Sequence, residues 1–443
     1  MKFFSTSKPK NFHSKGPYYQ YNRNVQLDFE ENQCSLVVAT KPFEMGMKKE
    51  NVRYTIHYGL PESLSLLYQE AGRAGRDRKE AVSQLLYTKD ALDERDTYAL
   101  FAMDTTMQET KRIVNRYGYK SARDLLTNFL FWLKARPSVK AEAALMQTIF
   151  HTIAEPNTEK ILHSQPLKRK IGDIQRALHR LSILGIVKEW SVKEWHPKDT
   201  IVYVTFQPYT DEHIEQSLLT YIKAYDATFS LSSHRMYKEQ TKPFVLRMAI
   251  ILIDWFDEML FYQKRMAFKT LIDSCSEHQL KEHVQHYFEM DDVTNQLADI
   301  VANEKAYPKW FAFCVEEEIE KKEVVLARFL ETYRMNVGLN FISGIIRLRR
   351  KQFSHVDGRD RLKAAFQIIQ HEQEETKQEI LLQTLQIGKR LEEEQKQQVS
   401  EVLLTFYPHK AEVIYEHLQD YYTLHYILEH AITRIQKVGG VFL

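Results

Sequence analysis

A short alternation of strand-like and helix-like segments near the amino terminus limits the fold of this chain more than any other feature. Three runs rich in apolar side chains, at residues 35–39, 52–58 and 83–87, have the length of strands. Ser63 begins a helical pattern between the second run and the third. Strands that alternate with helices predict a parallel sheet with crossover connections, so we expect residues 1–95 to hold a partial α/β domain.

The remainder of the chain is typical of a predominantly helical protein. Among its 443 residues only 14 are Gly and 12 are Pro, and residues 96–136 and 209–443 carry helical patterns almost throughout. The helices after residue 209 look short and evenly spaced. A tandem array of helix pairs is therefore one arrangement that the sequence allows.

Residues 137–208 interrupt the helical pattern with the layout of a winged helix, in which three helices precede a hairpin. The expected helices cover residues 139–154, a short segment from Thr158 and residues 167–184, and the expected strands cover residues 186–190 and 200–206. Gly185 lies at the C′ position of the last helix, where Gly commonly adopts left-handed backbone. Some winged helices bind DNA and others bind only protein, so the module alone does not decide the ligand.

Charge and cysteine content exclude several classes of protein. The formal net charge is +2, so contacts with nucleic acid have to come from local basic patches. Cys34, Cys275 and Cys314 are too few and too scattered for a disulfide framework or a four-cysteine zinc site, and they fit the reducing cytoplasm. The most apolar stretch, residues 244–260, is interrupted by charged side chains and predicts a buried helix, so no contact with a membrane is expected.

The stretch from Gln69 to Asp77 carries the most specific chemical signal in the sequence. Arg73 and Arg76 are three residues apart in a turn marked by Gly72 and Gly75. Two guanidinium groups on such a turn suit the γ-phosphate of a nucleotide, because an arginine finger stabilises charge that develops during phosphoryl transfer. The simpler alternative is a solvated basic turn at the end of a helix.

Residues 37–47, 51–58, 60–63 and 69–77 together resemble motifs V and VI of RecQ-type DNA helicases of superfamily 2. In that family these motifs belong to the second RecA-like motor domain. The resemblance runs from about residue 22 to residue 87. It implies a RecA-like fold for the amino-terminal α/β domain and an ATP-dependent, 3′-to-5′ DNA helicase activity for the complete motor.

The resemblance also implies roles for single residues. Gln69 and Arg73 would link nucleotide binding to closure of the motor, and Arg76 would be the finger on the γ-phosphate. Thr40 and the segment through Gly46 would couple the nucleotide site to the DNA track. These five residues are the expected catalytic and nucleotide-contacting residues.

The sequence departs from the family's pattern in ways that bear on activity. Glu44 replaces a Gly that permits unusual backbone dihedrals, and Lys48 replaces an acidic residue near the nucleotide. The 443 residues contain no Gly-x-x-x-x-Gly-Lys-Ser/Thr loop, so we expect the first motor domain to be missing. ATP and Mg²⁺ are therefore expected only if a partner, such as a separately encoded first motor domain, supplies that loop. Residues 98–136 hold no cysteine, so the family's zinc is not expected.

A basic cluster marks the expected winged helix. Its members are Lys168, Arg169, Lys170, Arg176 and Arg180 on the third helix, and Trp195 lies in the hairpin loop. We expect the cations to contact DNA phosphates and Trp195 to stack on an unpaired base. The alternative is a solvated helix face beside tryptophans that complete the core. A second basic strip, made of residues 347–351 with Arg359, Arg361 and Lys363, is either a phosphate contact or a solvated helix end.

Two functions from different classes remain. The first is a truncated RecQ-like DNA helicase that supplies the finger and DNA-binding elements and does not hydrolyse ATP alone. The second is a non-enzymatic DNA-binding or scaffold protein whose motor segment is a relic. Glu44 and Lys48 favour the second, whereas the intact Gln69, Arg73 and Arg76 favour the first. The sequence does not decide whether residues 209–443 grip DNA, bind another partner or bind the missing motor domain.

Overall fold

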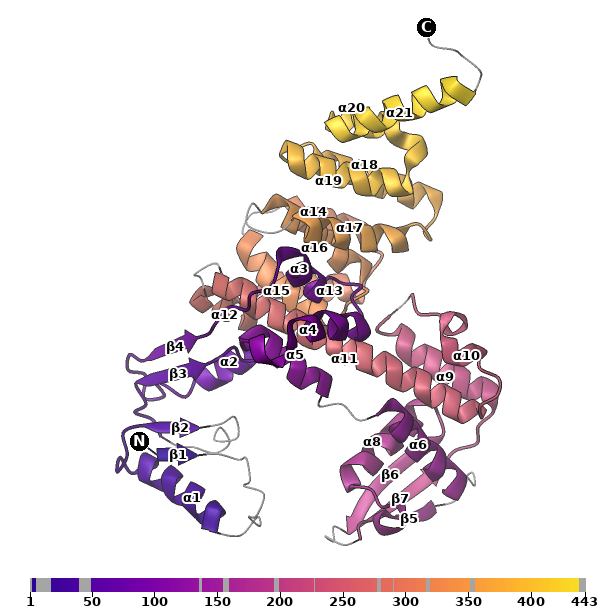
Figure 1. The fold of residues 1–443 in the computed structure, drawn as a ribbon. Helices are drawn as coiled ribbons and strands as arrows, with labels where there is room; N and C mark the ends of the chain where they lie inside the picture. Colours follow the sequence, from indigo (N-terminus) through magenta and orange to yellow (C-terminus); the bar gives the residue numbers. More distant parts are fainter. Residues whose placement is uncertain are drawn as a thin grey trace. The chain divides into compact units, whose positions relative to one another are not determined.

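The computed structural model of the chain divides into two compact units (Figure 1). One unit comprises Met1–Ala91 and Tyr117–Asn128, and the other comprises Leu92–Arg116 and Phe129–Leu443. The residues that the structure describes are 2–4, 17–39, 49–134, 138–153, 159–194, 199–226, 228–276, 280–289, 291–315, 319–350 and 355–437.

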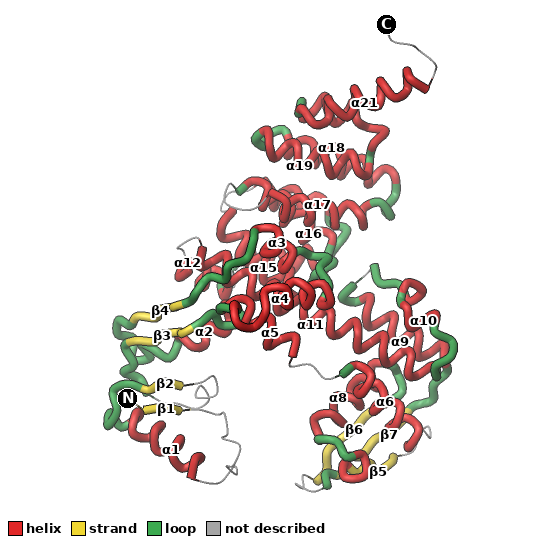
Figure 2. The backbone as a smooth tube through the Cα atoms, viewed as in Figure 1, coloured by secondary structure: helices red, strands yellow, loops and turns green. Residues whose placement is uncertain are grey.

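The first unit contains two small parallel sheets and short helices (Figure 2). Its elements are β1 (Lys2–Phe4), α1 (Pro17–Glu30), β2 (Val37–Ala39), β3 (Tyr54–Tyr58), α2 (Leu64–Ala71) and β4 (Val82–Leu86). β1 pairs with β2, and β3 pairs with β4 from the Tyr54–Val82 pair to the Tyr58–Leu86 pair. The predicted alternation of strands with helices is present, and β3 and β4 pair in parallel as predicted. β2 pairs with β1 instead, so the described residues do not join the three predicted strands in one sheet.

α2 forms where the sequence predicts it because its first turn and its buried face are both defined locally. The Ser63 hydroxyl accepts a hydrogen bond from the Leu66 amide at 3.2 Å and so caps the helix. Leu64 and Leu67, three residues apart, are both buried. This combination of cap and apolar stripe fixes the direction in which the chain enters the turn after the helix.

Two aspartates hold residues 117–128 within the first unit. Asp90 accepts hydrogen bonds from the amides of Arg123 at 2.5 Å and Leu125 at 2.9 Å, at the beginning of α5 (Asp124–Lys134). Asp124 in turn accepts a hydrogen bond from the Thr88 amide at 2.5 Å. A carboxylate at a helix N-terminus satisfies free amides and opposes the positive end of the helix dipole.

The second unit contains a module of three helices and a three-stranded antiparallel sheet. Its elements are α6 (Val139–Ile153), β5 (Glu159–His163), α7 (Ser164–Leu167), α8 (Ile171–Ile183), β6 (Val187–Glu194) and β7 (Ile201–Phe206). The strand order is β5-β7-β6. Gly185 follows α8 with φ 71°, the left-handed conformation that the sequence predicts at this position.

Two predictions about this module are wrong. The segment predicted as a short helix from Thr158 is β5, whose side chains alternate between exposed and buried and whose Leu162 pairs with Val202 of β7. The helix predicted from residue 167 begins at Ile171 instead, because Lys168 adopts left-handed backbone with φ 50° and ends α7. Thr158 itself lies outside the described residues.

Helices make up the rest of the second unit. They are α3 (Glu94–Phe101), α4 (Met107–Ser121, which crosses the boundary between the units), α9 (Asp211–Lys223), α10 (Arg235–Lys238), α11 (Phe244–Ser276), α12 (Leu280–Phe288), α13 (Asp292–Ala302), α14 (Tyr307–Val315), α15 (Ile319–Thr332), α16 (Val337–Arg349), α17 (His355–Ile369), α18 (Glu374–Gly388), α19 (Glu393–Phe406), α20 (Ala411–Leu418) and α21 (Tyr421–Lys437), with 3-10 turns η2 (Leu231–Ser233) and η3 (Pro408–Lys410). None of the described helices combines the length and apolar character needed to cross a membrane.

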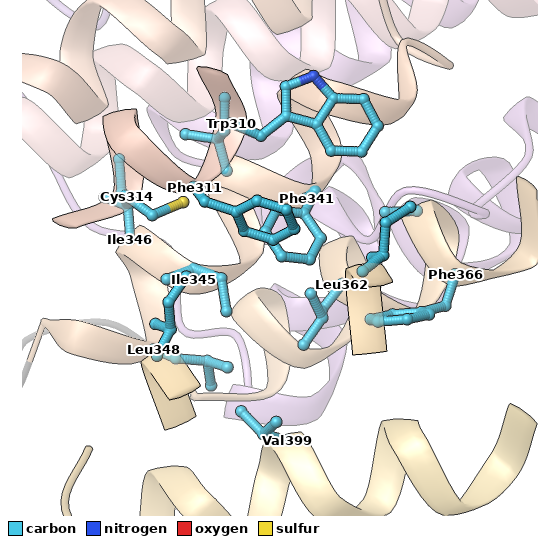
Figure 3. Packing of buried hydrophobic residues seen from close by; sticks show 14 of the residues in the cluster. Trp310, Phe311, Cys314, Phe341, Ile345, Ile346, Leu348, Leu362, Phe366 and Val399 are labelled. Carbon is cyan, nitrogen blue, oxygen red and sulfur yellow. The ribbon is translucent and has the colours of Figure 1, made fainter. Parts of the chain in front are cut away.

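Two large apolar clusters hold the second unit together. In one, Leu178 of α8, Val202 of β7 and Leu252 of α11 are completely buried, so the module with the sheet shares its core with α11. The other cluster runs through the later helices and includes Trp310 and Phe341 (Figure 3). The pairs α16–α17, α18–α19 and α20–α21 pack in succession, which is the tandem arrangement that the sequence allows (Figure 1).

α16 and α17 approach each other closely at two glycines. A Cβ atom on Gly344 would lie 2.8 Å from the amide nitrogen of Leu362 and 3.0 Å from its Cα. A Cβ atom on Gly358 would lie 3.1 Å from the carbonyl oxygen of Gly344. Rotation of a side chain cannot relieve contact with backbone atoms, so this helix crossing depends on glycine.

We expect Gly344→Ala to lower the free energy of unfolding of the helical array by about 1–3 kcal/mol, because the added methyl group forces α16 and α17 apart. Gly172→Ala at the start of α8 is the matched control, since a Cβ atom there meets no heavy atom of the described residues within 4 Å. That control is expected to be neutral or to stabilise by up to about 1 kcal/mol. Thermal unfolding followed by circular dichroism measures both changes. An unchanged midpoint for Gly344→Ala would show that the crossing tolerates a side chain.

Candidate functional site

The turn after α2, which carries the two arginines, is fixed to the sheet through its backbone. The Gly72 amide donates to the Tyr68 carbonyl at 2.8 Å and ends the helix. The Gly75 amide then donates to the Val52 carbonyl at 3.0 Å, just ahead of β3. Gly75 has φ 70°, and a Cβ atom there would lie 3.0 Å from the Lys79 carbonyl oxygen. The turn therefore requires glycine at this position.

An ion pair closes the same turn from its other end. The Arg53 guanidinium pairs with the Asp77 carboxylate, whose second oxygen accepts a hydrogen bond from the Lys79 amide at 3.2 Å. The hydrogen bond from Arg53 holds the pKa of Asp77 below its usual range. Asp77 is therefore an anchor for the turn that carries Arg73 and Arg76.

The structure brings three of the five predicted nucleotide-site residues into one short segment at the end of α2. Gln69 and Arg76 are exposed, and Arg73 is half-buried. Thr40 and Gly46 lie outside the described residues, as do the two positions that depart from the family's pattern. The described part of the predicted site thus consists of two cations and one amide group at a braced turn.

A polar chain that sequence reasoning missed links α2 to both strands of the neighbouring sheet. His57 is buried, with Nδ1 2.8 Å from Glu70 Oε2 and Nε2 3.0 Å from Ser83 Oγ. Ser83 Oγ also accepts a hydrogen bond from the Thr55 hydroxyl at 3.0 Å. The imidazole of His57 therefore connects a carboxylate on α2 to a hydroxyl on β4. The sequence signal that could have identified His57 is its position on the inward face of an alternating strand, next to the exposed Ile56.

The opposite face of this sheet is apolar and open. On β3, Tyr54 is 72%, Ile56 is 62% and Tyr58 is 95% exposed, and Val82 and Leu86 of β4 are exposed on the same face. Parallel sheets are ordinarily covered on both faces, because their crossover helices pack there. The first unit therefore presents a sheet surface of the kind that normally lies inside a domain.

The basic cluster predicted on the winged helix divides into two groups with different surroundings. Lys168, Arg169 and Lys170 are exposed and lie in the turn between α7 and α8, ahead of the helix on which the sequence placed them. Trp195 lies outside the described residues. The three exposed cations surround the N-terminal end of α8, where backbone amides and the helix dipole also favour an anion.

Arg176 and Arg180, the other two members, both pair with Glu142, but the Arg176 side chain is 39% exposed and that of Arg180 only 9%. The buried carboxylate of Glu142 on α6 lies 3.2 Å from Arg176 Nε and forms an ion pair with Arg180. Arg176 also contacts Asp173 at 2.5 Å. Burial lowers the pKa of Arg180, and Glu142 opposes that effect. The prediction of an exposed phosphate contact is therefore corrected for Arg180, whose side chain joins α8 to α6.

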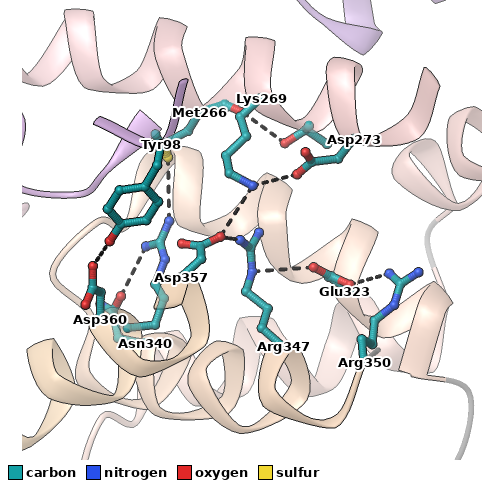
Figure 4. A network of polar contacts seen from close by, with 12 residues as sticks. Tyr98, Met266, Lys269, Asp273, Glu323, Asn340, Arg347, Arg350, Asp357 and Asp360 are labelled. Carbon is teal, nitrogen blue, oxygen red and sulfur yellow. Dashed lines mark hydrogen bonds and ion pairs between the residues drawn. The ribbon is translucent and has the colours of Figure 1, made fainter. Parts of the chain in front are cut away.

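The second predicted basic strip is also mostly internal (Figure 4). Arg347 is 5% exposed and pairs with Glu323 at 3.4 Å and with Asp357, while Arg350 pairs with the same glutamate. Arg361 is buried as well and donates to Asn340 and to Tyr262. Neither reading of this strip, as a phosphate contact or as a solvated helix end, describes these three arginines, because each is held among buried partners.

Comparison with known proteins finds a protein family whose conserved domain matches the segment that contains the arginine turn. Residues 12–78 match the helicase conserved C-terminal domain. The chain is 58% identical over 55 residues to the ATP-dependent DNA helicase Q-like SIM of Arabidopsis thaliana, which is 12% of this chain and 6% of that protein. It is 49% identical over 63 residues to the ATP-dependent DNA helicase RecQ of Haemophilus influenzae, which is 14% of this chain and 10% of that protein.

A third relative, the probable ATP-dependent DNA helicase RecS of Bacillus subtilis, is 45% identical over 62 residues, which is 14% of this chain and 12% of that protein. The chain thus spans only a small share of the length of the relatives that it matches. No solved structure matches the chain. The matched segment contains β2, β3, α2 and the turn with Arg73 and Arg76. Residues 12–78 of this chain therefore match the helicase conserved C-terminal domain and are similar in sequence to the corresponding part of RecQ-type DNA helicases.

Proposed function

We propose that this chain supplies the arginine finger and DNA-contacting surfaces of a RecQ-like, ATP-dependent 3′-to-5′ DNA helicase. The phosphate-binding loop of the motor would come from polypeptide outside these 443 residues, which contain no such loop. The observation that carries the proposal is the braced turn after α2, which presents Arg73 and Arg76. Arg76 would contact the γ-phosphate, and Gln69 and Arg73 would couple that contact to closure of the motor.

The bracing of the turn supports this role through preorganisation. An arginine finger lowers the barrier to phosphoryl transfer most effectively when its backbone does not have to be ordered during the reaction. The Gly75–Val52 hydrogen bond and the Arg53–Asp77 ion pair hold both sides of the turn before any nucleotide arrives. The contact between Glu70 and His57 also links α2 to the sheet, so a movement of the strands would displace the turn that carries Arg76.

The open face of the β3–β4 sheet supports a partner that completes the domain. Exposure of Tyr54, Ile56 and Tyr58 to water is unfavourable, and burial of such apolar surface stabilises the folded state by roughly 25 cal/mol per Å². We propose that the polypeptide segment that brings the phosphate-binding loop also covers this face with helices. ATP and Mg²⁺ would bind only in that assembly, with the loop on one side and Arg76 on the other.

For DNA, we propose that residues 137–208 act as a winged helix. Lys168, Arg169 and Lys170 would contact backbone phosphates at the N-terminal end of α8. The hairpin of β6 and β7 would approach the duplex, with Trp195 stacking on an unpaired base. Arg180 is not part of this surface, because its buried side chain pairs with Glu142. Arg176 also pairs with Glu142, but its side chain is 39% exposed, so it stays among the proposed phosphate contacts.

The rival proposal is a non-enzymatic DNA-binding or scaffold protein whose motor segment is a relic. Glu44 and Lys48 favour it, because a lysine in place of an acid reverses the charge beside the expected nucleotide. The two proposals share the DNA surface and differ only in whether the arginine turn acts on a nucleotide.

ATP hydrolysis distinguishes the two proposals. Mixed with the polypeptide that holds the phosphate-binding loop, the chain is expected to show DNA-stimulated ATPase activity that neither component shows alone. Arg76→Ala should lower the rate by about 10³-fold or more, since that is the usual contribution of an arginine finger. Lys79→Ala, which removes an exposed cation from the same turn, should leave the rate nearly unchanged. A mixture without activity, or equal losses for both variants, would favour the relic.

DNA binding tests the proposed wing surface. Reversing Lys168, Arg169 and Lys170 to Glu should weaken binding and lower the slope of log K against log salt by roughly 2–3, because each phosphate contact contributes about 0.9 to that slope. The matched control reverses Lys281, Lys389 and Arg390, three exposed cations outside both predicted basic clusters. Fluorescence anisotropy with labelled duplex DNA at several salt concentrations measures both slopes. Equal changes in the two triple variants would remove the wing from the DNA site.

A further inference from the structure

A cavity in the second unit, lined by no residue of the arginine turn or of the wing, combines aromatic side chains with carboxylates. It has a volume of about 230 Å³ and lies among the segment after α9, the middle of α11 and the turn after α15. Its walls include the rings of Tyr225, Phe229 and Trp255 and the carboxylates of Asp226, Asp254 and Glu258. α9 and α10 both pack against α11 here (Figure 1). The cavity is therefore built on the longest helix of the described residues.

The aromatic side chains form a corner. The centroids of the Tyr225 and Trp255 rings are 6.1 Å apart, and the two ring planes are inclined by 47°. Trp255 also packs at 5.3 Å against Phe256 and at 6.0 Å against Tyr221, which hold the indole in place. Two aromatic rings that line a small cavity suit a cation, because the face of an aromatic ring carries the negative part of its quadrupole.

The cavity lining contains more acidic side chains than basic ones. Glu258 accepts a hydrogen bond from the Met107 amide at 3.1 Å, and Asp226 accepts one from the Thr228 hydroxyl at 2.7 Å. Among the described residues, Asp254 has a single ionic neighbour, His234 Nε2 at 3.7 Å, which is beyond hydrogen-bond distance. Burial and repulsion from Asp257 and Glu258 raise the pKa of Asp254 to about 6. A positive charge placed in the cavity would relieve that repulsion.

The basic side chains of the lining do not neutralise these carboxylates. Arg334 donates to the Met103 carbonyl at 2.5 Å and lies 4.5 Å from the centre of the Tyr262 ring. Burial lowers the pKa of His234, so its imidazole is neutral near pH 7, and its Nδ1 accepts a hydrogen bond from the Met236 amide at 3.2 Å. With three carboxylates and one arginine, the lining carries a net negative charge.

We infer that this cavity binds an organic ammonium group, the cationic head of a lysine side chain or of a methylated amine. Tyr225 and Trp255 would contact the alkyl or methyl groups around the nitrogen, and Asp254 would supply the counter-charge. A phosphate or a nucleic-acid backbone does not fit, because three carboxylates line the site. The inference is independent of the proposed helicase role, since it uses none of the residues assigned to nucleotide or DNA.

Isothermal titration of the full chain tests this assignment. The probes are choline, a short peptide with a trimethyllysine or an unmodified lysine, and 3,3-dimethylbutan-1-ol, which is the neutral isostere of choline. Saturable binding of a cationic probe is expected, with the neutral isostere at least about tenfold weaker because it lacks the charge. Tighter binding of the peptides than of choline assigns the site to a protein ligand, and the reverse order assigns it to a free amine.

Three variants separate the cation site from a merely apolar cavity. Asp254→Asn keeps the shape of the side chain and should weaken binding of the cationic probe about tenfold. Trp255→Phe should retain much of the binding, and Trp255→Leu should lose it, because leucine has no π face. The control is Asp211→Asn, which removes an exposed carboxylate of α9 outside the cavity and should change nothing. Absence of binding by every cationic probe, equal affinity for the neutral isostere or an unchanged affinity in Asp254→Asn would overturn the assignment.

Discussion

The hydrogen bond between the Gly75 amide and the Val52 carbonyl is the contact on which the proposed chemistry depends. It joins the turn that carries Arg73 and Arg76 to the start of β3, across more than twenty residues of sequence. The bond exists only because Gly75 adopts left-handed backbone in space that a side chain would fill. The Arg53–Asp77 ion pair repeats the same connection with side chains, so both ends of the turn are attached to the residues at the start of β3.

The two units manage buried and exposed surface in opposite ways. The first unit leaves an apolar face of the β3–β4 sheet exposed, whereas parallel sheets are ordinarily covered on both faces. The second unit instead buries charge, since Lys269 and Arg347 share Asp357, and Arg347 and Arg350 share Glu323 (Figure 4). Burial lowers the pKa of Lys269 and raises that of Glu323, and their oppositely charged partners oppose both shifts. Loss of one partner in such a network leaves an uncompensated charge in the core.

Much of the first unit was predictable from the sequence because its determinants are local. The capping Ser63, the apolar stripe of α2 and the glycines of the turn all lie within a few residues of the structure that they specify. The strand β5 was mistaken for a helix because five residues are too few to show a period, and its pairing with β7 is made about forty residues away. The inward direction of Arg180 was hidden for the same reason, since Glu142 precedes it by 38 positions and belongs to another helix. The buried network around Arg347 joins segments up to about ninety residues apart, and a run of basic letters gives no sign of such partners.

The central claim is that Arg76 completes a nucleotide site whose phosphate-binding loop belongs to another segment of polypeptide. Trapping of ADP with aluminium fluoride tests it most directly, because this complex imitates the charge distribution of phosphoryl transfer and is held by the finger. The account predicts a stable complex of ADP, aluminium fluoride, the loop-bearing polypeptide and this chain, and its loss with Arg76→Ala. An equally stable complex with Arg76→Ala, or one that forms without this chain, would contradict the account.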